Sequence, residues 1–476
     1  MTSLRATALA LCFVVASCVS SRGLRTSGTP LDPHSLEAER SFAEVALSPT
    51  AWPAQDWWLE FGDPQLTTLI GEALQSNPTL DESEARARQA QALADSVNGA
   101  RRPQIDLNGS VTGAFLSEKY PVYPEYALGK FGWAKSVTMS FSWDLDLWGG
   151  RRAAWEGALG RSRSAQIDAY ATRIQVSVNV ALAYVALGYA FAQRDVTEAE
   201  VQRATQSLSL TRRLVAGGLG TPQQENLADS QVASAEQQEA QADRAIDAAR
   251  SALSVLVGQG PDRGLDITRP HLLDPAMLAV PDNLAVDLMG RRADLVAARW
   301  QVEAAAKDIK AARSEFLPNV SLSALGGFIL LGSGNPLTLP ARTYSVGPAL
   351  TLPVFDGGRL RAQLASDDAG YDEMVARYNG LLIAALNDVS DQVSALASVR
   401  KQIALEKRAQ QDALKSWNDA LTAYKGGLSG PLTPLIARQQ LLLTDQTLVQ
   451  LESEQADISI RLIEALGGGY GDTPRR

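Results

Sequence analysis

The sequence has very little histidine and cysteine, the residues that most often supply general bases, nucleophiles and metal ligands. Of its 476 residues, two are histidine and two are cysteine. His34 and His271 lie far apart in the chain, and no metal-binding spacing, nucleophile elbow or phosphate loop is present. The sequence therefore predicts a protein that is not an enzyme and that holds no metal or cofactor.

Two short motifs are the remaining candidates for chemistry. Gly332-Ser333-Gly334 is too short for a nucleotide-binding loop. Asp144 and Asp146 are paired carboxylates, but the strand pattern described below places both on one polar face, without a shaped pocket. A catalytic pair at these positions stays open only as an alternative interpretation.

The sequence also has no block of basic residues. It contains 44 Lys and Arg against 53 Asp and Glu, with a formal net charge of −9 at pH 7, which becomes −10 if Arg5 is removed with a signal segment. The basic residues are spread along predicted helices as solvated faces. This acidic balance argues against a nucleic-acid partner.

Residues 1–17 have the pattern of a bacterial targeting segment. Arg5 precedes a short apolar run from Ala6 to Val15, which contains Cys12. This run is too short to span a bilayer. The run ends in Val15-Ala16-Ser17-Cys18, which resembles a lipobox, so we expect Cys18 to carry lipid and the mature chain to keep no free thiol. The alternative is an ordinary signal peptide with an incidental cysteine.

The longest uninterrupted pattern runs from Arg151 to about Ala216. It has no proline, and its residues recur every seven positions in two series: Val180, Leu187, Arg194 (the polar member), Val201, Leu208 and Val215, and Ile167, Ile174 and Ala181. A seven-residue period is typical of a left-handed coiled coil. One helix of about 65 residues is roughly 100 Å long, which no compact domain needs.

The chain repeats this pattern about 210 residues later. Trp148-Gly149-Gly150-Arg151 recurs as Asp356-Gly357-Gly358-Arg359, and Ala216-Gly217-Gly218-Leu219 recurs as Lys425-Gly426-Gly427-Leu428. The sequence therefore predicts two tandem copies of one architecture, each with one long helix.

Before each long helix the periodicity changes from helical to two. In the first copy the alternating apolar positions are Ile105, Leu107, Val111 and Phe115, then Val137, Met139, Phe141, Trp143, Leu145 and Leu147, and in the second copy Tyr344, Val346, Leu350, Leu352 and Val354. A transmembrane barrel strand between lipid and a wet lumen requires such alternation. The alternative is a half-buried strand in a soluble sandwich, but the length of the runs favours the barrel.

Each copy thus contributes one hairpin, 103–147 and 318–355, whose loops 117–131 and 332–342 are expected to face outside the cell. Four strands cannot close a barrel, because the smallest single-chain barrels have eight. Open edges in lipid would leave backbone groups unpaired at several kcal/mol each. Strands from other chains must therefore complete the sheet.

Two shorter helices are predicted to pair with each long one, and a short helix 65–76 precedes the first set. Helices 78–101 and 222–258 accompany the first long helix, and 291–316 and 432–466 accompany the second, 357–425; the last has its own seven-residue series, Leu435, Leu442, Val449, Ala456 and Ile463. The predicted domains are a signal peptide 1–17, a lipidated extended leader 18–64, a first repeat 65–258, a linker 259–290, a second repeat 291–466 and a tail 467–476.

One apolar segment offers a competing interpretation. Val176 to Ala192 is apolar enough for a short transmembrane helix of about 17 residues. Its counterpart, Ala384 to Arg400, carries Asp388 and Asp391. Equivalent elements should share an environment, so we expect both segments to lie in a helical bundle outside the membrane.

A family resemblance begins at the end of the leader and extends over nearly the whole chain. The stretches Trp57-Trp58-Leu59-Glu60-Phe61-Gly62-Asp63-Pro64-Gln65-Leu66 and Asn77-Pro78-Thr79-Leu80 resemble NodT-type outer membrane efflux lipoproteins, the TolC-like family. The resemblance implies an α+β membrane protein in which three chains form a 12-stranded β-barrel on a long α-helical barrel. Val19 after the cysteine, in place of aspartate, implies by family analogy sorting to the outer membrane.

The resemblance further implies a passive exit duct for drugs or other small toxic compounds. Its partners would be two further copies of the chain, outer membrane lipid, a periplasmic adaptor and an inner-membrane transporter of the RND type. The alternatives are a duct for type I protein secretion or for an MFS- or ABC-driven exporter, and a non-conducting structural lipoprotein of the envelope.

Two sets of residues take functional roles by this resemblance. The adaptor would dock at the helix turns furthest from the membrane, Gly217, Gly218 and Leu219 with Gly426, Gly427 and Leu428. The periplasmic aperture would involve Gln224, Tyr424, Leu432, Thr433 and Ile436. Family members carry aspartate at one or more constriction positions, but the matching residues here are Thr433 and Ile436, and Ser429 replaces an arginine tether. We therefore expect an apolar constriction, which can close by dewetting.

Overall fold

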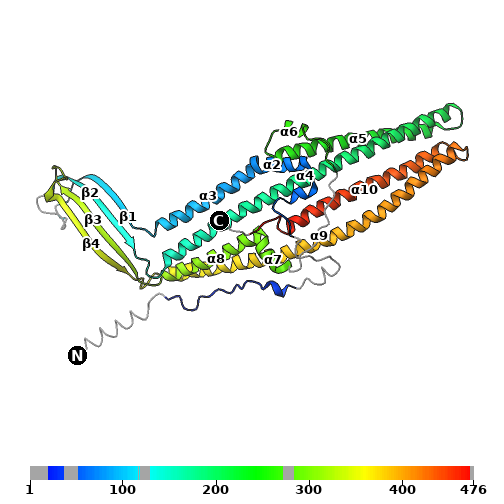
Figure 1. Cartoon of the computed structure of the whole chain (residues 1–476). Coiled ribbons are helices and arrows are strands. Elements are labelled where there is room, and N and C mark those ends of the chain that lie inside the picture. Colours follow the sequence, from blue (N-terminus) through cyan, green and yellow to red (C-terminus); the bar gives the residue numbers. More distant parts are fainter. Residues whose placement is uncertain are drawn as a thin grey trace. The chain divides into compact units, whose positions relative to one another are not determined.

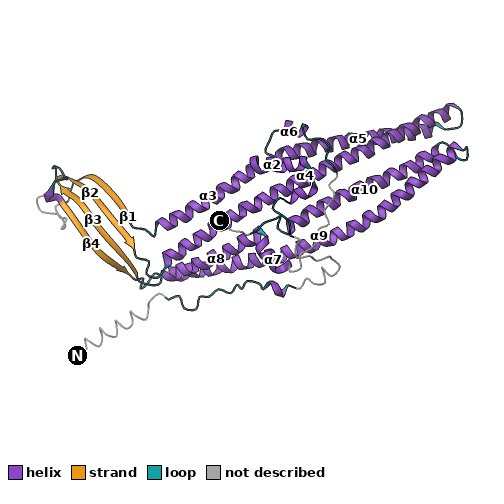
Figure 2. Cartoon of the chain, in the orientation of Figure 1, coloured by secondary structure: helices purple, strands orange, loops and turns teal. Residues whose placement is uncertain are grey.

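Helices make up most of the computed structural model, and the four strands among its described residues form one sheet (Figures 1 and 2). The structure describes residues 20–36, 52–115, 117, 119, 129–271 and 284–471. The signal segment, Cys18 and most of the loop between the first two strands lie outside these residues.

The elements follow one another in nearly the predicted order and positions. The helices are α2 (Pro64–Ser76), α3 (Pro78–Gly99), α4 (Gly150–Ala216), α5 (Pro222–Leu256), α6 (Asp262–Leu265), α7 (Leu284–Arg291), α8 (Ala293–Ser314), α9 (Arg359–Lys425) and α10 (Leu432–Ala465). The strands are β1 (Gln104–Phe115), β2 (Phe131–Asp144), β3 (Asn319–Leu331) and β4 (Arg342–Thr351). Short 3₁₀ helices are η1 (Pro33–Ser35), η2 (Trp57–Phe61) and η4 (Leu339–Ala341).

The two predicted copies match in the lengths of their elements. The long helices α4 and α9 have 67 residues each, α3 and α8 have 22 each, and α5 and α10 have 35 and 34. The range 259–290, predicted as a linker, contains α6 and most of α7. Because α7 precedes α8 as α2 precedes α3, it is the counterpart of α2 in the second copy.

The described chain divides into two compact units. The first, here called the sheet unit, comprises Met1–Pro30, Arg86–Ala165 and Ala297–Tyr378; the second, the helical unit, comprises Leu31–Ala85, Gln166–Val296 and Asn379–Arg476. The long helices α4 and α9 contribute to both units.

The sheet of the first unit has the order β1-β2-β3-β4, with every neighbouring pair antiparallel. The register places Leu107 opposite Met139, Met139 opposite Gly326, and Gly326 opposite Tyr344. These positions belong to one face, whose exposed apolar side chains are Ile105, Leu107, Val111, Phe115, Phe131, Trp133, Met139, Trp143, Tyr344, Val346 and Leu350. An apolar surface of this extent is not typical of a solvated protein face.

The opposite face of the sheet is mostly lined by small and hydroxyl-bearing residues. The register brings Ser110 opposite Ser136, and their hydroxyl oxygens lie 2.8 Å apart. Thr138 and Ser140 on β2 and Ser323 on β3 belong to the same face. The predicted alternation is therefore confirmed within the strands, with one apolar face and one hydroxyl-rich face. The prediction extended too far at two ends, because Leu145 and Leu147 lie beyond the end of β2 and Leu352 and Val354 lie beyond the end of β4.

The sheet is open, because among the described strands β1 and β4 each pair with one neighbour only. Every residue of β1 is exposed. The isolated sheet thus presents two unpaired backbone edges together with an apolar face.

Next to the sheet, α8 packs closely against α4. A Cβ at Gly157 would lie 2.8 Å from Oδ1 of Asp308, and one at Gly160 would lie 3.1 Å from the Cβ of Ala304. The absence of these two side chains lets the helices approach each other. Arg161 bonds Asp308 across the same contact, with an N–O distance of 2.6 Å.

The described leader binds along α9 through backbone groups and the hydroxyl of Ser27. Within the sheet unit, the carboxylate of Asp372 accepts hydrogen bonds from the amide of Ser27 at 3.0 Å, its hydroxyl at 2.6 Å and the amide of Gly28 at 2.7 Å. Near the start of α9, Arg361 donates to the carbonyl oxygens of Ser20 and Arg22. These bonds hold the chain just after Cys18 beside the start of α9.

In the helical unit, the apolar part of α4 is the centre of one of two hydrophobic clusters, and the second cluster is built on α9 and α10. Val178, Val180, Ala181 and Leu187 are fully buried and pack with residues of α2, α5 and η2. Among the described helices, α4 alone contains an 18-residue stretch apolar enough to cross a membrane. Its apolar residues are used for packing between helices, as the sequence predicted.

Each shorter pair of helices meets end to end at a joint in the helical unit. In the first copy the side-chain amide of Asn77, before α3, donates to the carbonyl oxygen of Leu256 at 2.7 Å. In the second copy Arg292, before α8, approaches the carbonyl oxygen of Ala465 at 3.5 Å. Gly258 and Gly467 complete the joints with positive φ angles of 72° and 97°.

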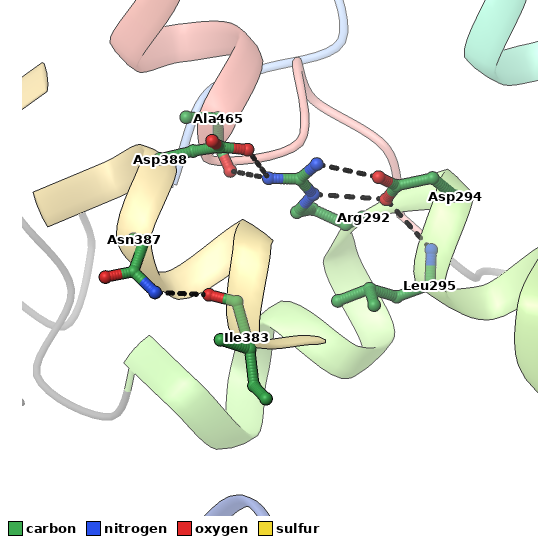
Figure 3. Close-up of polar contacts among 7 residues, drawn as sticks. All are labelled: Arg292, Asp294, Leu295, Ile383, Asn387, Asp388 and Ala465. Carbon is green, nitrogen blue, oxygen red and sulfur yellow. Dashed lines mark hydrogen bonds and ion pairs between the residues drawn. The ribbon is translucent and has the colours of Figure 1, made fainter. Parts of the chain in front are cut away.

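Arg292 also ties this second joint to the long helix α9 (Figure 3). Its guanidinium binds Asp294 at 2.6 Å and Asp388 at 3.3 Å. Burial lowers the pKa of Arg292, but the bonds and charges of the two carboxylates outweigh it, so the pKa is raised overall. Asp388, which argued against a membrane helix, is thus a partner in an ion pair.

We predict that Gly258→Ala destabilises the protein more than Gly218→Ala. Both glycines have a φ of 72°, where an L side chain costs roughly 1–2 kcal/mol. A Cβ at Gly258 would also lie 2.2 Å from the carbonyl oxygen of Ser76, whereas one at Gly218 meets nothing within 4 Å. Thermal unfolding followed by circular dichroism measures both variants, and equal shifts in Tm would contradict the packing argument.

We predict that Asp372→Ala releases the leader. The Ser27 hydroxyl, then the Gly28 and Ser27 amides, lower the pKa of Asp372 below its ordinary value of 3.8. Because the carboxylate form accepts these bonds, their contribution is present above pH 3.8 and is lost as the pH falls through the lowered pKa. Hydrogen-exchange protection factors of Ser27 and Gly28 should fall in the variant at neutral pH. Asp412→Ala, at an exposed carboxylate of α9, is the control. Unchanged protection of Ser27 and Gly28 in both variants would show that Asp372 does not hold the leader.

Candidate functional sites at the helix turns

The two turns that join the long helices to the returning helices have the same geometry. After α4, the amide of Leu219 donates to the carbonyl oxygen of Leu214 at 2.8 Å, and that of Gly218 donates to Val215 at 3.0 Å. After α9, the corresponding bonds run from Leu428 to Ala423 and from Gly427 to Tyr424, at 2.8 and 2.9 Å. This pattern is a Schellman motif, in which a residue with positive φ ends the helix.

Both turns project an apolar side chain into solvent. Leu219 is 81% exposed and Leu428 is 86% exposed. Gly218 and Gly427 have φ angles of 72° and 71°, with open space where a side chain would begin. The glycines explain how the chain turns, but they do not require a leucine to stand exposed beside each of them. An exposed leucine at the same position of both turns fits a contact surface for another protein.

The residues expected at the aperture surround the second turn, with one exception. Tyr424 lies in the last turn of α9, and Leu432, Thr433 and Ile436 lie in the first turns of α10. Tyr424 and Ile436 are 44% and 66% exposed. These four residues therefore belong to one end of one helical hairpin.

Gln224 belongs to the other hairpin, where it has a local role. Its amide donates to the hydroxyl of Thr221 at 3.4 Å, and its side-chain oxygen accepts from the amide of Thr221 at 2.9 Å. This reciprocal pair is a capping box at the start of α5. Within a single chain, the side chain of Gln224 therefore stabilises the start of a helix.

The beginning of α10 exposes a surface without charge, which the sequence alone did not reveal. The exposed residues between Leu432 and Gln450 are Thr433, Ile436, Gln439, Gln440, Leu443, Gln446, Thr447 and Gln450. The two charged residues of this segment are turned to α9, where Arg438 stacks on Trp417 and Asp445 accepts a hydrogen bond from Gln410. The sequence pattern that could have indicated this surface is the helical spacing of the uncharged residues.

The candidates for chemistry have structural partners. Asp144 pairs with Arg151, and Asp146 accepts from the amides of Arg151 and Arg152 at the start of α4. Among the described residues, no group of three or more His, Cys, Asp or Glu could hold a metal ion. Asp144 and Asp146 therefore join β2 to α4.

Comparisons with known proteins agree with this architecture. The sequence profile of the outer membrane efflux protein family matches residues 69–259 and 284–468. The fusaric acid resistance protein FusA of Burkholderia cepacia is 36% identical over 371 residues, which are 76% of this chain and 68% of FusA. The multidrug resistance outer membrane protein MdtP of Escherichia coli K12 is 28% identical over 476 residues, or 98% of this chain and 97% of MdtP.

A solved structure shows the same arrangement. The outer membrane protein VceC of Vibrio cholerae superposes with a TM-score of 0.79 at 34% identity, and the match covers 88% of this chain and all of VceC. The profile matches the two copies in turn, with its second match beginning at the first residue of α7. The chain belongs to the outer membrane efflux protein family.

Proposed function

We propose that this protein is the outer membrane exit duct of an RND-type efflux pump for small molecules. One observation carries the proposal: the sheet has an apolar face, a hydroxyl-rich face and two unpaired edges. An apolar face fits lipid, a hydroxyl-rich face fits a wet lumen, and unpaired edges cannot persist in a bilayer. Closure by further copies of the same chain satisfies all three features.

Three chains form the duct. They supply twelve strands, with β1 of each chain beside β4 of the next, and this number follows from the family. The relatives named for resistance to fusaric acid and to multiple drugs support small-molecule export rather than protein secretion. The duct is passive and needs no catalytic group, because the energy comes from an inner-membrane transporter.

The helical turns are the docking sites of a periplasmic adaptor. The exposed Leu219 and Leu428 support this assignment, since each stands beside a glycine turn of the same geometry. Two equivalent turns per chain give six in a trimer. An adaptor that recognises them would meet nearly the same surface six times.

The chain is anchored in the membrane by lipid on Cys18 as well as by the barrel. The bonds from Arg361 to Ser20 and Arg22 support this anchor, because they hold the chain two residues after Cys18 beside the start of α9. The helix α9 follows β4 after a short connection, so the lipid would emerge near the edge of the bilayer. One buried acyl chain gives only marginal binding, and the barrel supplies the second anchor.

We expect the protein in detergent to be a trimer that conducts ions. Native mass spectrometry should find three chains, and planar-bilayer recording should find a stable pore. Denatured chains in the same preparation should begin at Cys18 and carry the added mass of lipid. A stable monomer or dimer without conductance would contradict the closure argument.

We predict that Gly218→Phe or Gly427→Phe abolishes drug resistance in a complemented deletion strain. Each side chain would point into open space at a docking turn, and its strain of roughly 1–2 kcal/mol is too small to prevent assembly. Gly332→Phe is the matched control, since Gly332 also has a positive φ and open space but lies in the loop after β3. Growth with drug measures efflux, and full resistance in both turn variants would refute docking at the turns.

We predict that the wild-type pore resists block by trivalent cations from the periplasmic side and that Ile436→Asp makes it sensitive. The neutral start of α10 offers no carboxylate, whereas three aspartates near one axis would concentrate negative potential. Leu227, the matching position in the first copy, is 62% exposed, so Leu227→Asp is the control. Strong block of the wild type at micromolar concentration, or equal block of both variants, would show that the constriction lies elsewhere.

A further inference from the structure

A hollow of about 780 Å³ lies in the sheet unit where β2 ends. Its walls include Trp143, Leu147 and Trp148 from the end of β2 and the turn after it, Arg152 from α4, and Lys307 and Lys310 from α8. It lies at the end of β2, and Arg101, just before the edge strand β1, also lines it. The hollow has an apolar side and a basic side.

The apolar side continues the apolar face of the sheet. Trp143 pairs with Leu322 in the register, on the same face as Met139. Trp143, Leu147 and Trp148 are 37%, 60% and 49% exposed. The indole nitrogens of Trp143 and Trp148 donate to the carbonyl oxygens of Arg101 and Pro318, so both rings are held in place. Fixed tryptophans at the end of a barrel strand are typical of the boundary between lipid and water.

The basic side has more positive charge than its carboxylates balance. Glu156 serves two cations, with Arg152 at 2.8 Å and Lys307 at 2.7 Å. Hydrogen bonds from Lys307 and Arg152 lower the pKa of Glu156, so it stays ionised at neutral pH. Lys310 is three residues beyond Lys307 on the same face of α8, and it makes no hydrogen bond or ion pair within the described residues.

The remaining carboxylates of the hollow do not balance Lys310. Asp144 is paired with Arg151, and Asp146 accepts the amides at the start of α4. The hollow therefore offers an unpaired ammonium group and two cations that share one carboxylate, beside exposed indole rings. This combination suits an amphiphile whose anionic group is joined to an apolar tail.

We propose that this hollow binds a phospholipid, with its phosphate at Lys310 and its acyl chains along Trp143 and Leu147. The inference rests on the proposed placement of the sheet in the membrane. An inorganic phosphate would use the lysine but not the apolar wall, whereas a phospholipid uses both. The volume is also within the range of ordinary ligand sites.

The test measures binding of dioleoyl phosphatidylglycerol to the full-length protein in detergent by native mass spectrometry. Lys310→Ala should weaken the first lipid bound per chain by about fivefold, the usual effect of one lysine near an anionic lipid. Leu147→Ser should also weaken it. Lys401→Ala, at an exposed lysine of α9 without a partner among the described residues, is the matched control and should leave binding unchanged.

Inorganic phosphate at millimolar concentration is the second probe. The proposal is supported if phosphate does not displace the lipid and both hollow variants weaken lipid binding. It is overturned if either variant binds lipid like the wild type or if phosphate displaces the lipid; displacement together with an unaffected Leu147→Ser would indicate a free-phosphate site. Pore conductance of the wild type, recorded separately, tests the proposed exit-duct function. A failure of the lipid site can therefore be distinguished from a failure of the proposed function.

Discussion

The unpaired backbone along β1 and β4 is the constraint on which the rest of the structure depends. A four-stranded sheet with one apolar face is stable neither as a monomer in water nor as an open sheet in lipid. In the proposed duct, further copies of the chain close the sheet. The symmetry of that assembly would repeat every exposed feature of one chain around an axis, including the turns at Leu219 and Leu428 and the neutral start of α10.

Duplication within the chain supports the same geometry. The long helices α4 and α9 are equal in length, and so are α3 and α8 beside them. In each copy the same number of helical residues therefore leads from the hairpin to the turn. At both joints a side chain approaches a carbonyl oxygen at the end of the preceding helix, but the residue is Asn77 in the first copy and Arg292 in the second. The second joint adds the ion pair to Asp388 and so binds α8 to the long helix α9.

Local rules of the sequence predicted much of the fold and part of the candidate sites. The seven-residue period around Val180 and Leu187 located α4 to within about one residue at each end, because burial on one helix face leaves a regular trace. Alternation in β1 and β2 identified the two faces of the sheet, and the repeated glycines identified both turns. The need for further copies followed from the count of four strands.

Only the tertiary structure decided the contacts between residues distant in sequence. Asp372 accepts a hydrogen bond from Ser27, 345 residues away in the chain. Arg292 forms an ion pair with Asp388 on another helix, and Lys310 lines one hollow with tryptophans of the other repeat. Within the chain, Gln224, which is expected at the aperture, forms a capping box with Thr221 at the start of its own helix. Local sequence determines periodicity, helix ends and face polarity through neighbouring residues, whereas pairing of charges and the shape of a hollow depend on how separate elements meet.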